Sequence, residues 1–169
     1  MPLIGTEMFT RLLQTRHPDA VADILGNPEY EDIRGQVDFY DAGRGTLIVA
    51  EVFNLPKTGA DGKELTGIHG FHIHEGSSCT GTPEQPFADT GGHYDTDSRL
   101  HPLHTGDMPP LFASDGYAYL IFYTTKFRPF DLLGKTVIIH QNQDDLTTNP
   151  SGNSGEKIAC GVIKQNLRI

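Results

Sequence analysis

Histidine is the residue type whose number and spacing in this sequence point most directly to chemistry. Six of the eight histidines, together with Asp107, fall within residues 70–75, 92–95, 101–107 and 137–140. Copper and zinc ions bind imidazole readily, whereas histidines in general are intermediate between the interior and the surface of proteins. The cluster therefore predicts a metal-binding protein, most simply a metalloenzyme.

The first set of candidate ligands depends on two expected strands. His72 and His74 are two residues apart in the apolar segment 68–74, so in a strand both side chains leave the same face. His140 ends a separate apolar segment, and His93 lies in the loop between the two. Four imidazole nitrogens in a tetragonal arrangement suit copper(II).

The second set of candidate ligands lies within one loop and offers three imidazoles and a carboxylate, from His93, His101, His104 and Asp107. A closed set of four such ligands is what a tetrahedral structural zinc requires. If His93 serves both ions through its two ring nitrogens, each ion has four ligands. We expect the two remaining histidines, His17 and His69, to be structural or solvated.

Short β-strands are the elements that should position these ligands. Apolar segments bounded by turn residues predict about eight strands, among them 20–25, 32–40, 46–55, 68–74, 117–124, 135–140 and 157–164. Residues 75–110 form a long irregular stretch, and a loop of that length in a compact domain is normally functional. An all-β sandwich or barrel with long loops is therefore expected.

A chain of 169 residues, 37% of them hydrophobic, is most simply one folded domain. We expect residues 20–169 to form the β-domain. Residues 1–19 are expected to be an N-terminal arm or a short amphipathic helix, and these two readings stay open. The helix is supported by apolar residues at helical spacing, Met8, Phe9, Leu12 and Leu13.

Charge and cysteine content narrow the possible partners and location. A net charge of −9 argues against nucleic acid or an anionic membrane as a partner, and no stretch approaches the roughly 18 apolar residues of a membrane span. Residues 1–19 lack the continuous apolar run of a secretory signal, which favours a cytoplasmic location.

Cys79 and Cys160 are either two buried free thiols or one long-range disulfide.

Two segments of the sequence resemble the copper–zinc superoxide dismutase family, especially its bacterial branch. They are Gly-Phe-His-Ile-His-Glu at 70–75 and Gly-Asn-Ser-Gly-Glu-Lys-Ile-Ala-Cys-Gly at 152–161. The resemblance extends over roughly residues 20–169 and implies an eight-stranded Greek-key β-barrel or flattened sandwich. It also implies that Cys79 and Cys160 form a disulfide, and that Asp144 bonds the free ring nitrogens of His72 and His101.

The same resemblance implies both metals and a reaction. Copper would be held by His72, His74, His93 and His140, and zinc by His93, His101, His104 and Asp107. The implied activity is dismutation of superoxide to oxygen and hydrogen peroxide, a defence against reactive oxygen species. Copper would cycle between two oxidation states and zinc would be structural. A homodimer is possible, and a non-catalytic zinc- or copper-binding protein of the same fold remains the alternative.

Two residues are expected to be catalytic: His93, as the proton carrier, and Lys157. The family has an arginine, which guides and docks the anion, where this chain has Lys157. Lysine keeps the positive charge but loses the planar, fixed set of donors that arginine presents. We therefore expect attraction of the anion to survive and its docking to suffer, giving an active but slower enzyme.

Overall fold

The structure is a computed structural model that describes residues 4–58 and 62–167. The start of the expected N-terminal arm, residues 1–3, and the end of the expected β-domain, residues 168–169, lie outside the described residues, as do residues 59–61. Within the described part, nine antiparallel strands form one sheet in the order β4-β6-β7-β3-β2-β1-β9-β8-β5. Their bounds are β1 Ala20–Gly26, β2 Arg34–Asp41, β3 Thr46–Phe53, β4 Ile68–His69, β5 Phe71–His74, β6 Leu111–Ser114, β7 Tyr117–Thr124, β8 Thr136–His140 and β9 Lys157–Gln165.

The sheet curls into a nearly closed barrel because one segment of chain occupies both of its edges. The expected strand 68–74 is divided at Gly70 into β4 and β5. The first half pairs with β6 and the second with β8, at opposite ends of the strand order. The nine strands are therefore the expected eight with one divided. The sequence pattern did not identify β6, which is only four residues long.

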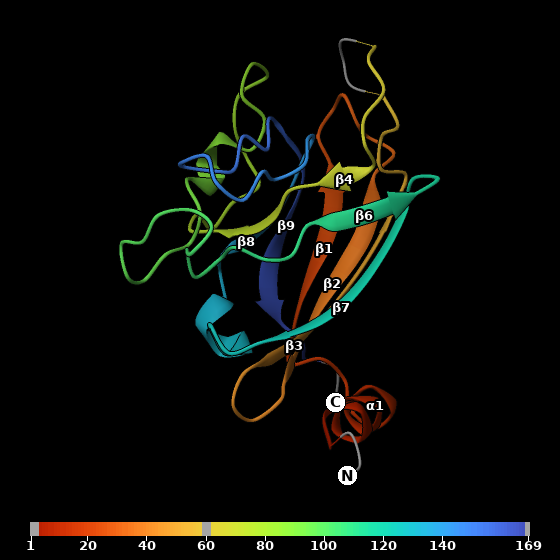
Figure 1. Ribbon diagram of the computed structural model, residues 1–169, viewed down its shortest axis with the longest axis vertical. Coiled ribbons are helices and arrows are strands. Elements are labelled where there is room, and N and C mark those ends of the chain that lie inside the picture. Colours follow the sequence, from red (N-terminus) through yellow and green to blue (C-terminus); the bar gives the residue numbers. More distant parts are fainter. Residues whose placement is uncertain (1–3, 59–61, 168–169) are drawn as a thin grey trace.

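The connections between strands follow a Greek-key pattern. The first three strands are consecutive neighbours, but the chain then crosses from β3 to β4 and later from β7 to β8, which are not adjacent in the sheet. These two crossings carry the chain over the ends of the barrel (Figure 1). The expected all-β Greek-key barrel is confirmed.

Strand alternation separates the core from the candidate ligands. On β5, Phe71 and Ile73 belong to the main hydrophobic core, so His72 and His74 point to the opposite face. All four residues are nevertheless buried, because the loops 75–110 and 141–156 cover that outer face. Figure 1 shows these two loops gathered on one side of the barrel. The histidines thus lie between a rigid sheet and a layer of loops.

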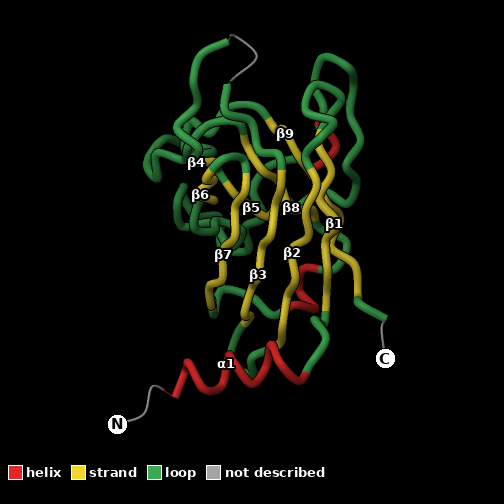
Figure 2. The backbone as a smooth tube through the Cα atoms, turned by 90° about the vertical axis from the view of Figure 1, so that its right-hand side faces the viewer, coloured by secondary structure: helices red, strands yellow, loops and turns green. Residues whose placement is uncertain are grey.

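In the described residues one α-helix, α1 (Ile4–Thr15), precedes the barrel, which agrees with the helical reading of the N-terminal segment. It lies across the ends of the strands (Figure 2), far from the covering loops. The ring of Phe9 packs against Tyr123 of β7 with 5.3 Å between centroids. Two short 3-10 helices, η1 (Ala88–Thr90) and η2 (Pro129–Leu132), complete the described helices. No helix in the described ranges is long and apolar enough to cross a membrane.

Candidate metal centre

Backbone pairing brings the loop ligands to the strand ligands. One edge of β5 pairs with β8, and loop residues bond the other edge: Ile73 N donates to Gly106 O, and Tyr94 N donates to Ile73 O, at 2.9 and 2.8 Å. This places His93 opposite His74 and Asp107 opposite His72 as isolated bridges. The loop therefore extends the sheet locally, and its ligands arrive in register with those of the strand.

The copper-side group consists of four side chains whose ligand atoms lie within 4.8 Å of one another: His72, His74, His93 and His140. In this group, Nδ1 of His72 and Nε2 of the other three rings are buried and have no hydrogen-bond partner among the described residues. Unpaired buried nitrogens are rare, because each loses its bond to water. Four of them converging on one point fit a metal ion with nitrogen ligands.

Hydrogen bonds from Nδ1 of His74 and His140 determine which ring nitrogen keeps its lone pair. His74 Nδ1 donates to Gly91 O at 2.9 Å, and His140 Nδ1 donates to Gly155 O at 3.1 Å. Burial lowers the pKa of His140 to about 3, and burial also places the pKa of His74 well below its usual value. Both rings are thus neutral at pH 7 with the lone pair on Nε2, the form that binds metal.

The zinc-side group comprises His93, His101, His104 and Asp107, again with ligand atoms within 4.8 Å of one another. Nδ1 of His93 donates to Asp107 Oδ1 at 2.7 Å, and Nδ1 of His101 and of His104 lie 3.3 and 3.2 Å from Oδ2. Burial raises the pKa of Asp107, but the bond from His93 and the neighbouring imidazoles outweigh it and hold this pKa at about 2. Three imidazoles and an ionised carboxylate fit a structural zinc.

Asp144 joins the two groups from behind. Its Oδ2 accepts from His72 Nε2 at 2.7 Å and its Oδ1 accepts from His101 Nε2 at 2.8 Å, and the carboxylate is buried. The approach depends on Gly152, whose φ is +65°; a Cβ there would lie 1.9 Å from Asp144 Oδ1. Such a partner holds both rings with Nδ1 turned toward the metal sites.

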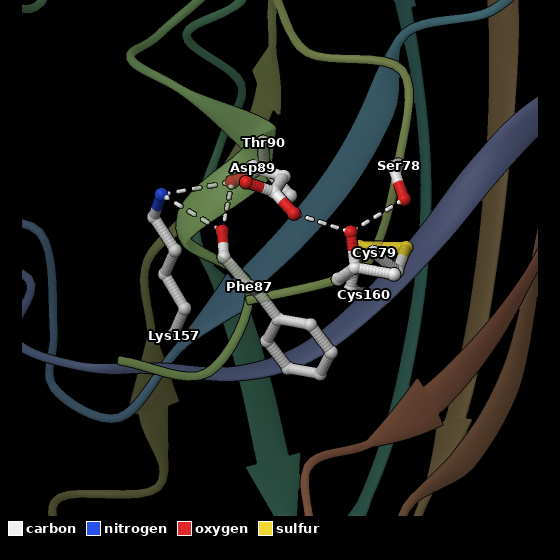
Figure 3. Close-up of a disulfide and its surroundings, with 8 residues drawn as sticks. Ser78, Cys79, Phe87, Asp89, Thr90, Lys157 and Cys160 are labelled. Atoms are coloured by element: carbon white, nitrogen blue, oxygen red, sulfur yellow. Dashed lines mark hydrogen bonds between the residues drawn. A yellow bond between two sulfur atoms is a disulfide. The ribbon is translucent and has the colours of Figure 1, made fainter. Parts of the chain in front are cut away.

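Cys79 and Cys160 form a disulfide, so the free-thiol reading is wrong (Figure 3). The bond joins the loop after β5 to β9, two segments 81 residues apart in the sequence. Phe87 of the same loop packs with Cys160 and Ile138 in a small hydrophobic cluster of its own. The covering loop is thus attached to the barrel covalently and by packing.

Lys157 lies beside the copper-side group because of a β-bulge. Ile158 and Ala159 are consecutive in β9 yet both belong to the core, and the β8–β9 register shifts between Ile139 and His140. The shift pairs Lys157 with His140 and turns it to the face of the ligands. Lys157 lines a surface hollow together with His74, His93 and His140.

Some supporting groups could not be identified from the sequence. Lys126 Nζ donates to the main-chain oxygens of His104 and Asp107 at 2.9 and 3.0 Å, and so holds the zinc-side turn. The main-chain carbonyls of Gly91 and Gly155 accept from His74 and His140, and no side chain in the sequence indicates these contacts. The other two histidines lie outside both groups: His17 is exposed, and buried His69 donates from Nδ1 to His140 O at 3.0 Å.

Comparison with known proteins agrees with this geometry. The family model described as copper/zinc superoxide dismutase matches residues 33–163, most of the barrel. The chain belongs to the copper/zinc superoxide dismutase family.

Individual relatives cover most of the chain. It is 34% identical to a Cu-Zn superoxide dismutase of Legionella pneumophila, over 96% of each chain. It is 32% identical to one of Deinococcus radiodurans, over 87% of this chain and 85% of the relative. It is also 34% identical to Cu-Zn superoxide dismutase 1 of Aquifex aeolicus, over 85% of this chain and 86% of the relative.

Proposed function

We propose that this chain dismutates superoxide, a defence against reactive oxygen species, and that it uses copper and zinc in the two groups described above. In the overall reaction one superoxide gives up an electron and leaves as dioxygen, and a second takes up one electron and two protons and leaves as hydrogen peroxide. The observation that carries the proposal is the convergence of unpaired histidine nitrogens in two groups that share His93.

Each metal is assigned to the group whose donors suit it. Copper would be held by His72, His74, His93 and His140, whose unpaired ring nitrogens converge. Zinc would be held by His93, His101, His104 and the Asp107 carboxylate. Copper, when bound, supplies one-electron redox chemistry, and zinc supplies a fixed charge without redox change.

The chain's own residues orient the site and handle the proton. Asp144 and the carbonyls of Gly91 and Gly155 hold four of the rings by their outer nitrogens. His93 differs because it has a ligand group on each side. We assign it the proton-carrying role, with the proton held at Nε2, its unpaired nitrogen in the copper-side group.

Lys157 supplies positive charge at the rim of that hollow, in a chain whose net charge is −9. Its charge attracts the superoxide anion over several ångströms, since attraction at that range depends on charge and not on donor geometry. The missing guanidinium fork makes the enzyme slower than one with arginine there. Lys157→Arg is therefore expected to raise the rate, and a rate that is unchanged or lower contradicts this.

Superoxide consumption by the protein reconstituted with copper and zinc tests the function. We expect fast consumption that is lost when the metals are removed by a chelator and returns when they are restored. The alternative is a non-catalytic zinc- or copper-binding protein of the same fold. It predicts that the protein binds both metals yet consumes superoxide no faster than its metal-free form.

A second copy of the chain is the proposed protein partner. An outward row on β3 and β7 leaves large side chains exposed: Phe53, Tyr117, Tyr119, Ile121 and Tyr123. Contiguous exposed aromatic surface is typical of protein interfaces. Sedimentation at micromolar concentration should show a dimer that Tyr119→Lys dissociates, and a monomer at all concentrations tested argues against it.

A further inference from the structure

The ammonium of Lys157 is occupied by the covering loop. Its three hydrogens have three acceptors: Thr90 Oγ1 at 2.8 Å, Gly91 O at 2.9 Å and Phe87 O at 3.4 Å. Figure 3 shows the amine directed at Phe87 and Thr90. Thr90 is fully buried, and its hydroxyl donates its own hydrogen to Phe87 O at 2.8 Å, so it accepts from the lysine. An anion in the hollow therefore finds no unused hydrogen on Lys157.

One of those acceptors also orients a ligand. The carbonyl oxygen of Gly91 accepts from Lys157 Nζ and from His74 Nδ1, each at 2.9 Å. A carbonyl has two lone pairs and can accept both donors. The position of this oxygen determines the rotation of the His74 ring, and with it the direction of the buried Nε2.

The disulfide does not by itself fix the position of Gly91. It attaches Cys79, whereas Gly91 lies twelve residues further along the chain, immediately before Gly92 and His93. Lys157 and Cys160 are three positions apart on β9. The strand thus holds the loop at two points, covalently at Cys79 and through the ammonium at residues 87–91.

We propose that Lys157 is a positioning residue for His74, acting through the Gly91 carbonyl, and that it affects the anion through its charge alone and not through a hydrogen bond. This inference rests on the proposed role of His74 as a copper ligand. It also explains how arginine can improve the site: a guanidinium has five N–H donors, enough to hold the loop and still present donors to an anion.

Three variants separate positioning from charge. Lys157→Met keeps much of the length but removes the charge and all three bonds. Thr90→Val keeps the lysine and its charge but removes one of its three acceptors. It therefore still tests positioning if Lys157→Met does not fold. Lys157→Arg restores donors and charge. Lys164→Met, which removes an exposed charge further along β9, is the matched control.

The readouts are the electron paramagnetic resonance spectrum of bound copper(II), the copper dissociation constant and the salt dependence of the rate. We expect Lys157→Met to change the spectrum and weaken copper binding about 10-fold, the lower end of the range for loss of a partner that orients a ligand. Thr90→Val should change the spectrum in the same direction but less, with the salt dependence intact. Lys157→Arg should keep the wild-type spectrum, as should Lys164→Met.

The proposal is overturned if Lys157→Met and Thr90→Val both keep the wild-type spectrum and copper affinity while Lys157→Met loses the salt dependence of the rate. Lys157 would then act by charge alone. Because spectrum and affinity are measured without turnover, they can support positioning even if the wild-type protein fails to consume superoxide. Failure of the proposed function is therefore distinguishable from failure of this inference.

Discussion

The two halves of the metal centre are built from different kinds of structure. On the copper side, His72, His74 and His140 come from β5 and β8, which pair in continuous register. On the zinc side, all four members lie at residues 93–107, within the loop between β5 and β6. The sheet therefore positions the first half, whereas the second half depends on a small number of cross-links.

Those cross-links are polar and specific. Lys126 holds two main-chain oxygens of the zinc-side turn, and the hydroxyls of Thr96 and Thr105 bond each other at 2.9 Å across the base of the loop. Asp144 ties His101 to His72 of the strand half. Because the two halves are held by different elements, each should respond separately when a ligand is removed from the other.

Removal of one ligand from each half gives the largest expected contrast. His140→Ala should lower superoxide consumption at least about 100-fold, more than loss of an orienting partner costs, and should leave zinc bound. His104→Ala should release zinc but reduce the rate less than roughly 10-fold, since zinc has no redox role. Metal content and superoxide consumption measure both. Equal losses of rate in the two variants would show that the halves are not separable.

Asp144→Asn should disturb both halves at once. An amide can offer one oxygen to His72 or His101, but its NH2 then faces the other ring's N–H, so one ring loses its orientation. We expect affinity for each metal to fall by about 10- to 100-fold, as for other partners that orient a ligand. Asp145→Asn is the matched control, because Asp145 accepts from Thr147 and Thr148 in its own turn. Unchanged metal affinity in Asp144→Asn would show that Asp144 does not orient the metal ligands.

Acid should destabilise the metal-free protein through the copper-side histidines. Burial lowers their pKa values, that of His140 to about 3, so between about pH 3 and 6.5 the unfolded chain binds more protons than the folded one. The contribution of these histidines to the free energy of unfolding is fully present above about pH 6.5 and decreases as the pH falls. The lowered pKa values of Asp107 and Asp144 act in the same direction. Calorimetry should give a midpoint roughly 5–10 °C lower at pH 4.5 than at pH 7.5, and a flat profile would contradict this.

Lys126→Met should have the smallest effect and confine it to the zinc side. Loss of its two bonds loosens the turn between His104 and Asp107, so zinc affinity should fall a few-fold, below the roughly 10-fold typical of direct ligand partners. The copper(II) spectrum should not change. Zinc competition titrations, with Lys164→Met as the control, measure the effect. If Lys126→Met lowered the affinity for copper more than the affinity for zinc, Lys126 would not belong to the zinc side.

The strand half of the site was predictable from the sequence for a physical reason. Spacing of two in a strand fixes the face, so His72 and His74 had to point together once β5 was recognised. Periodicity also indicated the N-terminal helix, although it left a terminal arm open as the alternative. The loop half was predictable only as an ordered set of ligands, because the path of residues 75–110 has no period.

Contacts to main-chain atoms were not predictable. Nothing in the residue types indicates that Lys126 and Lys157 donate to carbonyls, or that Gly91 orients His74, because every residue carries the same carbonyl. The split of the edge strand at Gly70 and the bulge that turns Lys157 outward also depend on how the barrel closes. The charge of Lys157 was recognised from the sequence, whereas its attachment to the loop required the structure.

Anomalous diffraction at the copper and zinc absorption edges, from crystals of the reconstituted protein, locates each metal among the proposed ligands. We expect two separate peaks, copper within the His72, His74, His93 and His140 group and zinc within the group of His93, His101, His104 and Asp107, with the His93 ring between them. A single ion, or either metal bound outside these groups, would contradict it.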